Sequence, residues 1–133
     1  MRISAEFESL GRVFAQDGVD LAEPVGSEPG YRRPAIVLQR DEVNASGIDT
    51  VVLCVLTSNT RLARARGNTL LRRGVTGLPR DSVANSSQIA TVNKADLDRV
   101  VGVLPEAQMS EVDEDLRGRL RIDAPSLWLL DTE

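Results

Sequence analysis

The sequence predicts a mainly β (α+β) fold in which a sheet or barrel is followed by one C-terminal helix. Two continuous runs of β-branched and aliphatic residues, 35–39 and 50–56, predict strands that are buried on both faces or at the core of a barrel. Pro105 is well placed at the first position of a helix, and apolar residues then repeat at intervals of three and four: Met109, Val112, Leu116 and Leu120. The chain has 133 residues, enough for one domain with a substantial core and too few for two.

Further elements are expected between these segments. Residues 69–73 predict a short strand, and residues 82–92 are small and β-branched enough to favour another strand despite the polar Asn85, Ser86 and Ser87. Asn93 is expected to cap a short helix over residues 94–101. The apolar stretch 126–130 is expected to pack on the barrel or on a second subunit.

Composition limits the chemistry. The chain has no histidine and one cysteine, Cys54, whose apolar surroundings predict a buried strand residue and not a nucleophile. The usual zinc and copper ligand sets cannot be built from these residues, so no metal or cofactor is expected. The chain also lacks an apolar run of about 18 residues and a recognisable signal peptide, which predicts a cytoplasmic protein.

Charge is unevenly distributed along the chain. The net charge is −4, yet residues 26–80 carry nine basic and four acidic side chains. A basic middle segment fits a phosphate-binding surface, because counterion release depends on the local patch and not on the total charge. The alternative is that these arginines are simply solvated.

The segment GSEPGYRRP (26–34) has the composition of a loop but places an arginine at the start of a predicted strand. Pro34 disfavours the helical conformation for Arg33, so Arg33 is expected to be extended where the strand begins. The glycines of this loop allow a ligand to approach the backbone. This position suits an anion.

The order of the motifs GSEPGYRRP, VLTSN (55–59), GNTLL (67–71) and TGLPRDSVANSSQ (76–88), followed by an amphipathic helix that contains Val-Asp, resembles the MazF/PemK family of toxin endoribonucleases. The resemblance extends from about Asp20 to Leu120. It implies a small SH3-like β-barrel with helices, a homodimer, and a cognate antitoxin that inhibits it. It also implies metal-independent cleavage of single-stranded RNA at short sequence motifs, leaving a 2′,3′-cyclic phosphate and a 5′-hydroxyl.

The resemblance also implies the site residues. By position, Arg33 and Thr57 match the family's principal catalytic pair, and Glu28 and Arg32 match loop positions near the substrate. The remaining matches lie in the motifs VLTSN and TGLPRDSVANSSQ: Ser58, Asn59, Arg80, Asp81, Ser82 and Gln88.

An arginine suits RNA cleavage by attack of the 2′-hydroxyl, because its planar guanidinium presents two parallel donors to the phosphate. Arg33 is therefore expected to stabilise the transition state, with Thr57 contacting the scissile phosphate. An arginine is a poor base, which leaves Glu28 and, less favoured, Asp81 as the general base. The structural alternatives are that Thr57 bonds its own turn, that Glu28 pairs with Arg32, and that Asp81 caps a turn.

RNA binding needs stacking surfaces or phosphate contacts. Tyr31 is the one aromatic residue in the loop and is expected to stack on a base. Phosphate contacts are expected from arginines of the basic segment: Arg32, Arg61, Arg64 and Arg66.

The two ends of the chain depart from the family pattern. Ahead of Asp20 the chain reads FAQDGV (14–19), in which Gly18 weakens the strand that family members have there. Residues 1–19 and 122–133 are therefore atypical. Two other functions remain open: a CcdB-like toxin that binds DNA gyrase without cutting nucleic acid, and an inactive relative.

Overall fold

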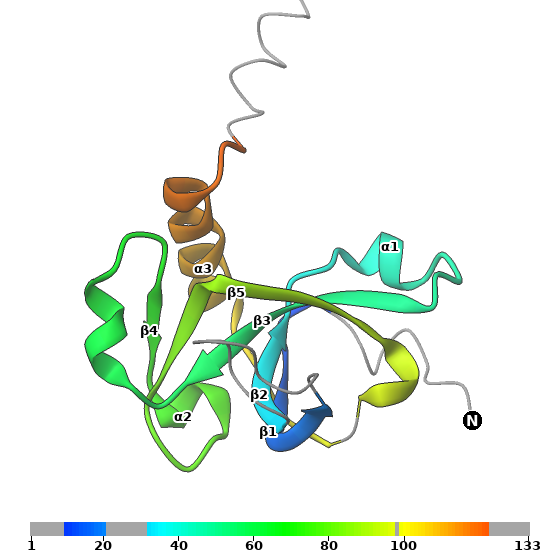
Figure 1. Ribbon diagram of the computed structural model, residues 1–133, viewed down its shortest axis with the longest axis horizontal. Helices are drawn as coiled ribbons and strands as arrows, with labels where there is room; N and C mark the ends of the chain where they lie inside the picture. The colour runs from blue at the N-terminus through cyan, green and yellow to red at the C-terminus, as the bar shows by residue number, and fades with distance from the viewer. Residues whose placement is uncertain (1–9, 21–31, 98, 123–133) are drawn as a thin grey trace, which may run out of the picture.

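The computed structural model describes residues 10–20, 32–97 and 99–122, which form a curled antiparallel sheet with a helix against it (Figure 1). The strands pair in the order β4-β5-β3-β2-β1-β6. The elements along the chain are β1 (Arg12–Asp20), β2 (Arg32–Val37), α1 (Asp41–Asn44), β3 (Thr50–Thr57), the 3₁₀ helix η1 (Thr60–Arg64), β4 (Thr69–Leu71), α2 (Arg73–Thr76), β5 (Ser82–Asn93), the 3₁₀ helix η2 (Lys94–Asp96), β6 (Val100–Val103) and α3 (Glu106–Arg119).

The two apolar runs form the centre of the sheet, as predicted. β2 and β3 are antiparallel neighbours, with Ile36 opposite Cys54 and Val37 opposite Leu53. Alternate residues enter two core clusters: Ile36 and Cys54 pack with residues of α3, whereas Val37 and Leu53 pack with Leu97. Both faces of the central strands are therefore covered, which is why these runs are continuously apolar.

The first strand, which the sequence left in doubt because of Gly18, forms as β1, and its pairing with β2 is interrupted around Gly18. Its register with β2 runs from Phe14 opposite Ala35 to Val19 opposite Arg33, so five steps along β1 match two along β2. The extra residues form a bulge, and a glycine is well tolerated in such an interruption of the ladder.

The predicted helix over 94–101 is wrong. A single 3₁₀ turn, η2, is followed by strand β6, and Asn93 makes no side-chain bond that caps the turn. β6 pairs with β1, with Val13 opposite Gly102. The β-branched residues of 100–103 find a strand partner that local sequence does not reveal, and this tertiary pairing overrides the helical spacing.

Smaller differences concern the ends of elements. β4 stops at Leu71 where 69–73 was expected, because Arg73 begins the one-turn helix α2. The C-terminal helix is confirmed and begins at Glu106, with Pro105 at the N-cap, one residue before the position expected for it. Met109 and Val112 are buried, whereas Leu120 lies beyond the helix end and is 39% exposed. The stretch 126–130 lies outside the described residues.

Two glycines allow α2 and β6 to approach each other closely. A Cβ on Gly77 would lie 2.4 Å from the carbonyl oxygen of Val101, and a Cβ on Gly102 would lie 2.4 Å from the carbonyl oxygen of Thr76. Gly77 also has a φ of 83°, which side chains other than glycine rarely adopt. α2 is thereby fixed against the strand at the edge of the sheet. No helix within the described ranges combines the length and the apolar character needed to cross a bilayer.

Candidate active site

A pocket of about 360 Å³ opens where β2 begins, β3 ends and β5 begins. Its lining combines apolar and polar residues: Arg33, Pro34, Leu56, Ser58, Leu78, Pro79, Arg80 and Ser82. Two cations and two hydroxyl groups therefore surround a partly apolar floor. Such a lining suits an anionic ligand that also has an apolar or aromatic part.

Arg33 reaches the pocket from the start of β2. β1 pairs Val19 with Arg33, and β3 pairs Val55 with Ala35. Ala35 and Val55 are the last residues that β2 and β3 pair at this end, so Arg33 and Thr57 each lie two residues beyond that pair. Thr57 itself pairs with Val83 of β5 and is not part of the pocket lining, which Ser58 joins from the next position in the chain.

Thr57 and Asn59 shape the turn after β3. The Thr57 hydroxyl accepts a hydrogen bond from the Asn59 N–H at 3.2 Å, and the Asn59 side chain accepts one from the Arg61 N–H at 3.3 Å. Thr57 thus bonds its own turn, the structural alternative considered for it. The bond uses the oxygen as an acceptor and leaves the hydroxyl proton to be donated elsewhere.

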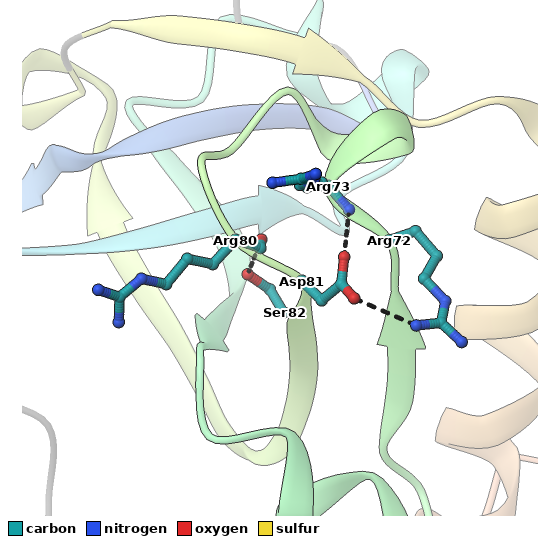
Figure 2. Close-up of polar contacts among 5 residues, drawn as sticks. All are labelled: Arg72, Arg73, Arg80, Asp81 and Ser82. Carbon is teal, nitrogen blue, oxygen red and sulfur yellow. Dashed lines mark hydrogen bonds and ion pairs between the residues drawn. The ribbon is translucent and has the colours of Figure 1, made fainter.

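The chain between α2 and β5 forms the other wall of the pocket, and Asp81 is its central polar contact (Figure 2). The Asp81 carboxylate accepts a hydrogen bond from the backbone N–H of Arg73 at 2.9 Å and one from the Arg72 guanidinium at 3.1 Å. The Arg73 N–H, followed by the Arg72 guanidinium, lowers the pKa of Asp81. The interpretation of Asp81 as the residue that caps a turn is confirmed, and a carboxylate with a lowered pKa is a poor general base.

Ser82 and Arg80 are joined by their own contact. The Ser82 hydroxyl donates to the carbonyl oxygen of Arg80 at 3.2 Å, while the Arg80 side chain extends away from Asp81 (Figure 2). Ser82 is 3% exposed and Arg80 is exposed. The wall therefore presents an exposed cation and a buried hydroxyl.

The other predicted RNA-binding residues lie at several places. Arg61, Arg64 and Arg66 are exposed along the connection from β3 to β4, and residues 50–80 contain no acidic side chain. Gln88 is half-buried on β5, accepts a hydrogen bond from the Asn85 side chain at 3.4 Å, and does not line the pocket. The structure therefore brings Arg33, Ser58 and Arg80 together in the pocket lining, whereas Thr57, which precedes Ser58 in the chain, and Gln88 are not part of that lining.

The side chains of three other predicted site residues are not placed relative to the pocket. Glu28 and Tyr31 lie outside the described residues. Arg32 is in β2, where its backbone pairs with Asp20 of β1.

The sequence did not single out the apolar lining of the pocket. Leu56, Leu78 and Pro79 carry no reactive group, and they follow or precede predicted site residues by one or two positions. Only their position near the predicted residues Thr57 and Arg80 in the sequence could have identified them as lining residues.

The described residues offer no cluster of three or more histidine, cysteine, aspartate or glutamate side chains suited to a metal ion. Cys54 is fully buried, and burial raises the pKa of its thiol to about 12. The thiol is therefore protonated at neutral pH and is not a nucleophile, as the sequence predicted.

Comparisons with known proteins agree with this geometry. The chain is 51% identical over 98 residues to Endoribonuclease MazF6 of Mycobacterium tuberculosis (strain ATCC 25618 / H37Rv), covering 74% of this chain and 86% of that protein. It is 33% identical over 98 residues to Endoribonuclease EndoA of Bacillus subtilis (strain 168), covering 74% and 84%.

A solved structure described as an endoribonuclease in complex with its cognate antitoxin from a mycobacterial species has the same fold. Its TM-score is 0.67 at 20% identity, over 88% of this chain and 98% of that one. Residues 18–119 match the family described as the PemK-like, MazF-like toxin of type II toxin-antitoxin systems. With a family match over most of its length and a close relative over three quarters of it, the chain belongs to the PemK/MazF toxin family.

Proposed function

We propose that this chain is a MazF-type endoribonuclease toxin that cleaves single-stranded RNA at short sequence motifs without a metal ion. The observation that carries the proposal is the pocket lining, in which Arg33 meets Ser58 and Arg80. The relatives named as endoribonucleases support it, as does the family match over residues 18–119, which includes every residue of the pocket lining.

Arg33 stabilises the transition state in the proposed mechanism. Attack of the 2′-hydroxyl on the adjacent phosphorus concentrates negative charge on the non-bridging oxygens, and the guanidinium donates two parallel hydrogen bonds to them. A preorganised donor of this kind lowers the barrier by roughly 3–4 kcal/mol. The bond from the 5′-oxygen to phosphorus breaks, and Arg33 is placed to help protonate that oxygen. The products are a 2′,3′-cyclic phosphate and a 5′-hydroxyl.

Thr57 orients the scissile phosphate. Its oxygen accepts the Asn59 N–H, which fixes the hydroxyl and directs its proton towards a phosphate oxygen. Ser58 and Arg80 contact the same nucleotide from the pocket, and Ser82 helps to fix the wall that carries Arg80.

Glu28 is the proposed general base. The chain has no histidine, and Asp81 is engaged with Arg72 and Arg73. Glu28→Gln is expected to slow cleavage while leaving RNA binding largely intact, as measured by single-turnover cleavage and filter binding. Unchanged turnover would remove Glu28 from this role.

The exposed arginines of the β3–β4 connection bind the RNA backbone outside the pocket. They are Arg61, Arg64 and Arg66. Arg32 of β2 is proposed to contact a phosphate as well, while Tyr31 stacks on a base and Asn59 and Gln88 contact bases. Because phosphate contacts release counterions, RNA affinity is expected to fall steeply with salt. A flat response of the dissociation constant to NaCl would contradict this arrangement.

The proposed partners are a second copy of the chain and a cognate antitoxin. Support for the antitoxin comes from family membership and from the relative solved in complex with its own antitoxin. A gyrase-binding toxin without nuclease activity is not favoured, because such a protein needs neither Arg33 nor Thr57 in this arrangement and the similar proteins carry endoribonuclease names.

The decisive test is incubation of the purified protein with a long, unstructured RNA in EDTA, with Arg33→Ala as the matched control. Discrete cuts with 5′-hydroxyl ends that disappear in the variant are expected. Mapping the ends gives the recognition motif in the same experiment. No cuts from a folded protein, or cuts that require added metal, would overturn the proposal.

A further inference from the structure

The connection from Arg72 to Ser82 supplies half of the pocket lining, yet it contains only one helical turn. Leu78, Pro79, Arg80 and Ser82 all belong to it. A segment with so little regular structure keeps its side chains in place only through specific contacts. Which contacts hold it therefore decides how well Arg80 and Ser82 are positioned.

The middle of the connection is attached to the fold by buried contacts. Thr76 is fully buried, and its hydroxyl accepts a hydrogen bond from the Leu78 N–H at 3.1 Å. Gly77 lies against the backbone of β6, with no room for a Cβ. These contacts fix the chain as far as Leu78 but do not reach Arg80.

The two ends of the connection are joined by the β4–β5 ladder, in which Leu71 pairs with Ser82, and by Asp81 (Figure 2). Its carboxylate accepts the N–H of Arg73, the first residue of α2, at 2.9 Å. Asp81 stands between Arg80 and Ser82 in the chain, so this bond closes the connection directly behind the two pocket residues. Ser82 is already held by its pairing with Leu71, whereas Arg80 precedes the strand. We propose that Asp81 is a positioning residue for the cleavage reaction, acting through the Arg73 N–H to hold Arg80 in the pocket that contains Arg33.

The backbone bond, and not the ion pair, performs this role. The Arg72 side chain is 71% exposed, and ion pairs of exposed side chains contribute little. The Arg73 N–H is instead fixed by the start of α2, so it holds the carboxylate at a defined place. It is also the largest influence that lowers the pKa of Asp81.

The chain offers a variant that removes this single donor. Arg73 occupies the first position of α2, where proline is well tolerated, and Arg72 has φ −73° and ψ 148°, which suits a residue before proline. Arg73→Pro therefore deletes the N–H with little disturbance of the backbone. Arg73→Gln keeps the N–H and removes the same charge, which makes it the matched control.

This inference rests on the proposed function, so the assay is RNA cleavage by the whole chain, with kcat and KM measured separately. Arg73→Gln is expected to cleave as the unmodified protein does. Arg73→Pro and Asp81→Ala are expected to lose about tenfold to a hundredfold in kcat/KM, because a small displacement of a positioned group is costly. Asp81→Asn keeps an acceptor oxygen and is expected to retain most of the activity.

A double-mutant cycle separates positioning from general stability. If Asp81 acts through Arg80, Arg73→Pro should cause little further loss when it is combined with Arg80→Ala, whereas independent effects would add. Thermal unfolding of each variant accompanies the kinetics.

Several outcomes would overturn the inference. Undiminished cleavage by Arg73→Pro would do so, as would an equal loss of activity in Arg73→Gln or full additivity of Arg73→Pro with Arg80→Ala. Loss of cooperative unfolding in Arg73→Pro or Asp81→Ala would also overturn it, because the bond would then support the fold as a whole. An unmodified protein that does not cleave RNA would instead overturn the proposed function.

Discussion

The two ends of the β2–β3–β5 sheet both carry polar side chains, but they use them differently. At one end, Arg33, Ser58, Arg80 and Ser82 line an open pocket. At the other end, Gln39, Asn44 and Lys94 form a closed cluster whose polar groups bond to one another and to nearby backbone. In Figure 1 the two ends correspond to the sides of the molecule that carry α2 and α1.

The closed cluster shows how polar residues behave when they serve the fold. The Gln39 side chain donates to Asn44 at 2.9 Å and to the Thr50 carbonyl at 3.1 Å, and the Asn44 side chain returns a bond to the Gln39 carbonyl at 3.0 Å. The Lys94 ammonium donates to the Asn44 carbonyl at 2.7 Å. Polar groups that satisfy one another stabilise a turn, whereas polar groups that surround an empty volume are available to a ligand.

The largest effect is expected at Arg33. Arg33→Ala should lower kcat by about a hundredfold to a thousandfold, as the loss of a preorganised donor does elsewhere. Arg33→Lys should recover little of this, because an ammonium cannot present two parallel donors in a plane. The measurement is single-turnover cleavage of an RNA that contains the mapped motif.

Lys94→Ala at the opposite end is the control for Arg33. It removes one positive charge from the closed cluster and should leave kcat unchanged at a temperature where the protein stays folded. An equal loss of kcat in the two variants would mean that net charge, and not the pocket, governs cleavage.

A smaller effect is expected at Thr57. Thr57→Val removes the hydroxyl at nearly constant volume and should lower kcat/KM by about tenfold, since a hydrogen bond to a charged group contributes roughly 1.5–3 kcal/mol. Thr57→Ser keeps the hydroxyl and should retain most of the activity. If the two variants cleave equally well, the Thr57 hydroxyl serves the Asn59 turn alone.

The contrast between the ends also explains what the sequence could predict of the fold. Segments 35–39 and 50–56 were recognisable because burial on both faces makes nearly every residue apolar, Gln39 and Thr50 at their ends excepted. β1 and β6 were not, because β6 forms its ladder with β1, which in turn pairs with β2, and Gly18 lies where the β1–β2 ladder is interrupted. Pairing between distant segments leaves little trace in local composition.

The site shows the same division. Arg33, Ser58 and Arg80 were predicted from motifs and meet in the pocket, whereas Leu56, Leu78 and Pro79 complete its wall without any distinctive chemistry. The separation of Gln88 from the pocket depends on the path of β5, which bulges against β3 between Ala84 and Ile89. Sequence motifs therefore identify reactive groups better than they identify the shape that surrounds them.

Asn44 should separate stability from activity. It is 2% exposed, and Asn44→Ala removes the donor to the Gln39 carbonyl and the acceptor for the Gln39 amide. Leaving these groups unsatisfied should lower the free energy of unfolding by about 1–3 kcal/mol, as measured by urea denaturation. Cleavage well below the melting temperature should not change, and a loss of kcat comparable to that of Thr57→Val would show that the two ends are coupled.

The smallest effect is expected at Cys54, which lies on β3 between the two ends and pairs with Ile36 and Ile89. Burial raises the pKa of its thiol to about 12, so at pH 8 the native protein holds the unreactive protonated form. Iodoacetamide at pH 8 should therefore label the protein in guanidinium chloride but not the native protein, whose cleavage activity should be unchanged after treatment. Rapid labelling of the native protein would mean that β3 opens without global unfolding. Since β3 extends from Thr50 at the closed cluster to Thr57 at the end of the sheet that carries the pocket, such opening would disturb both ends together.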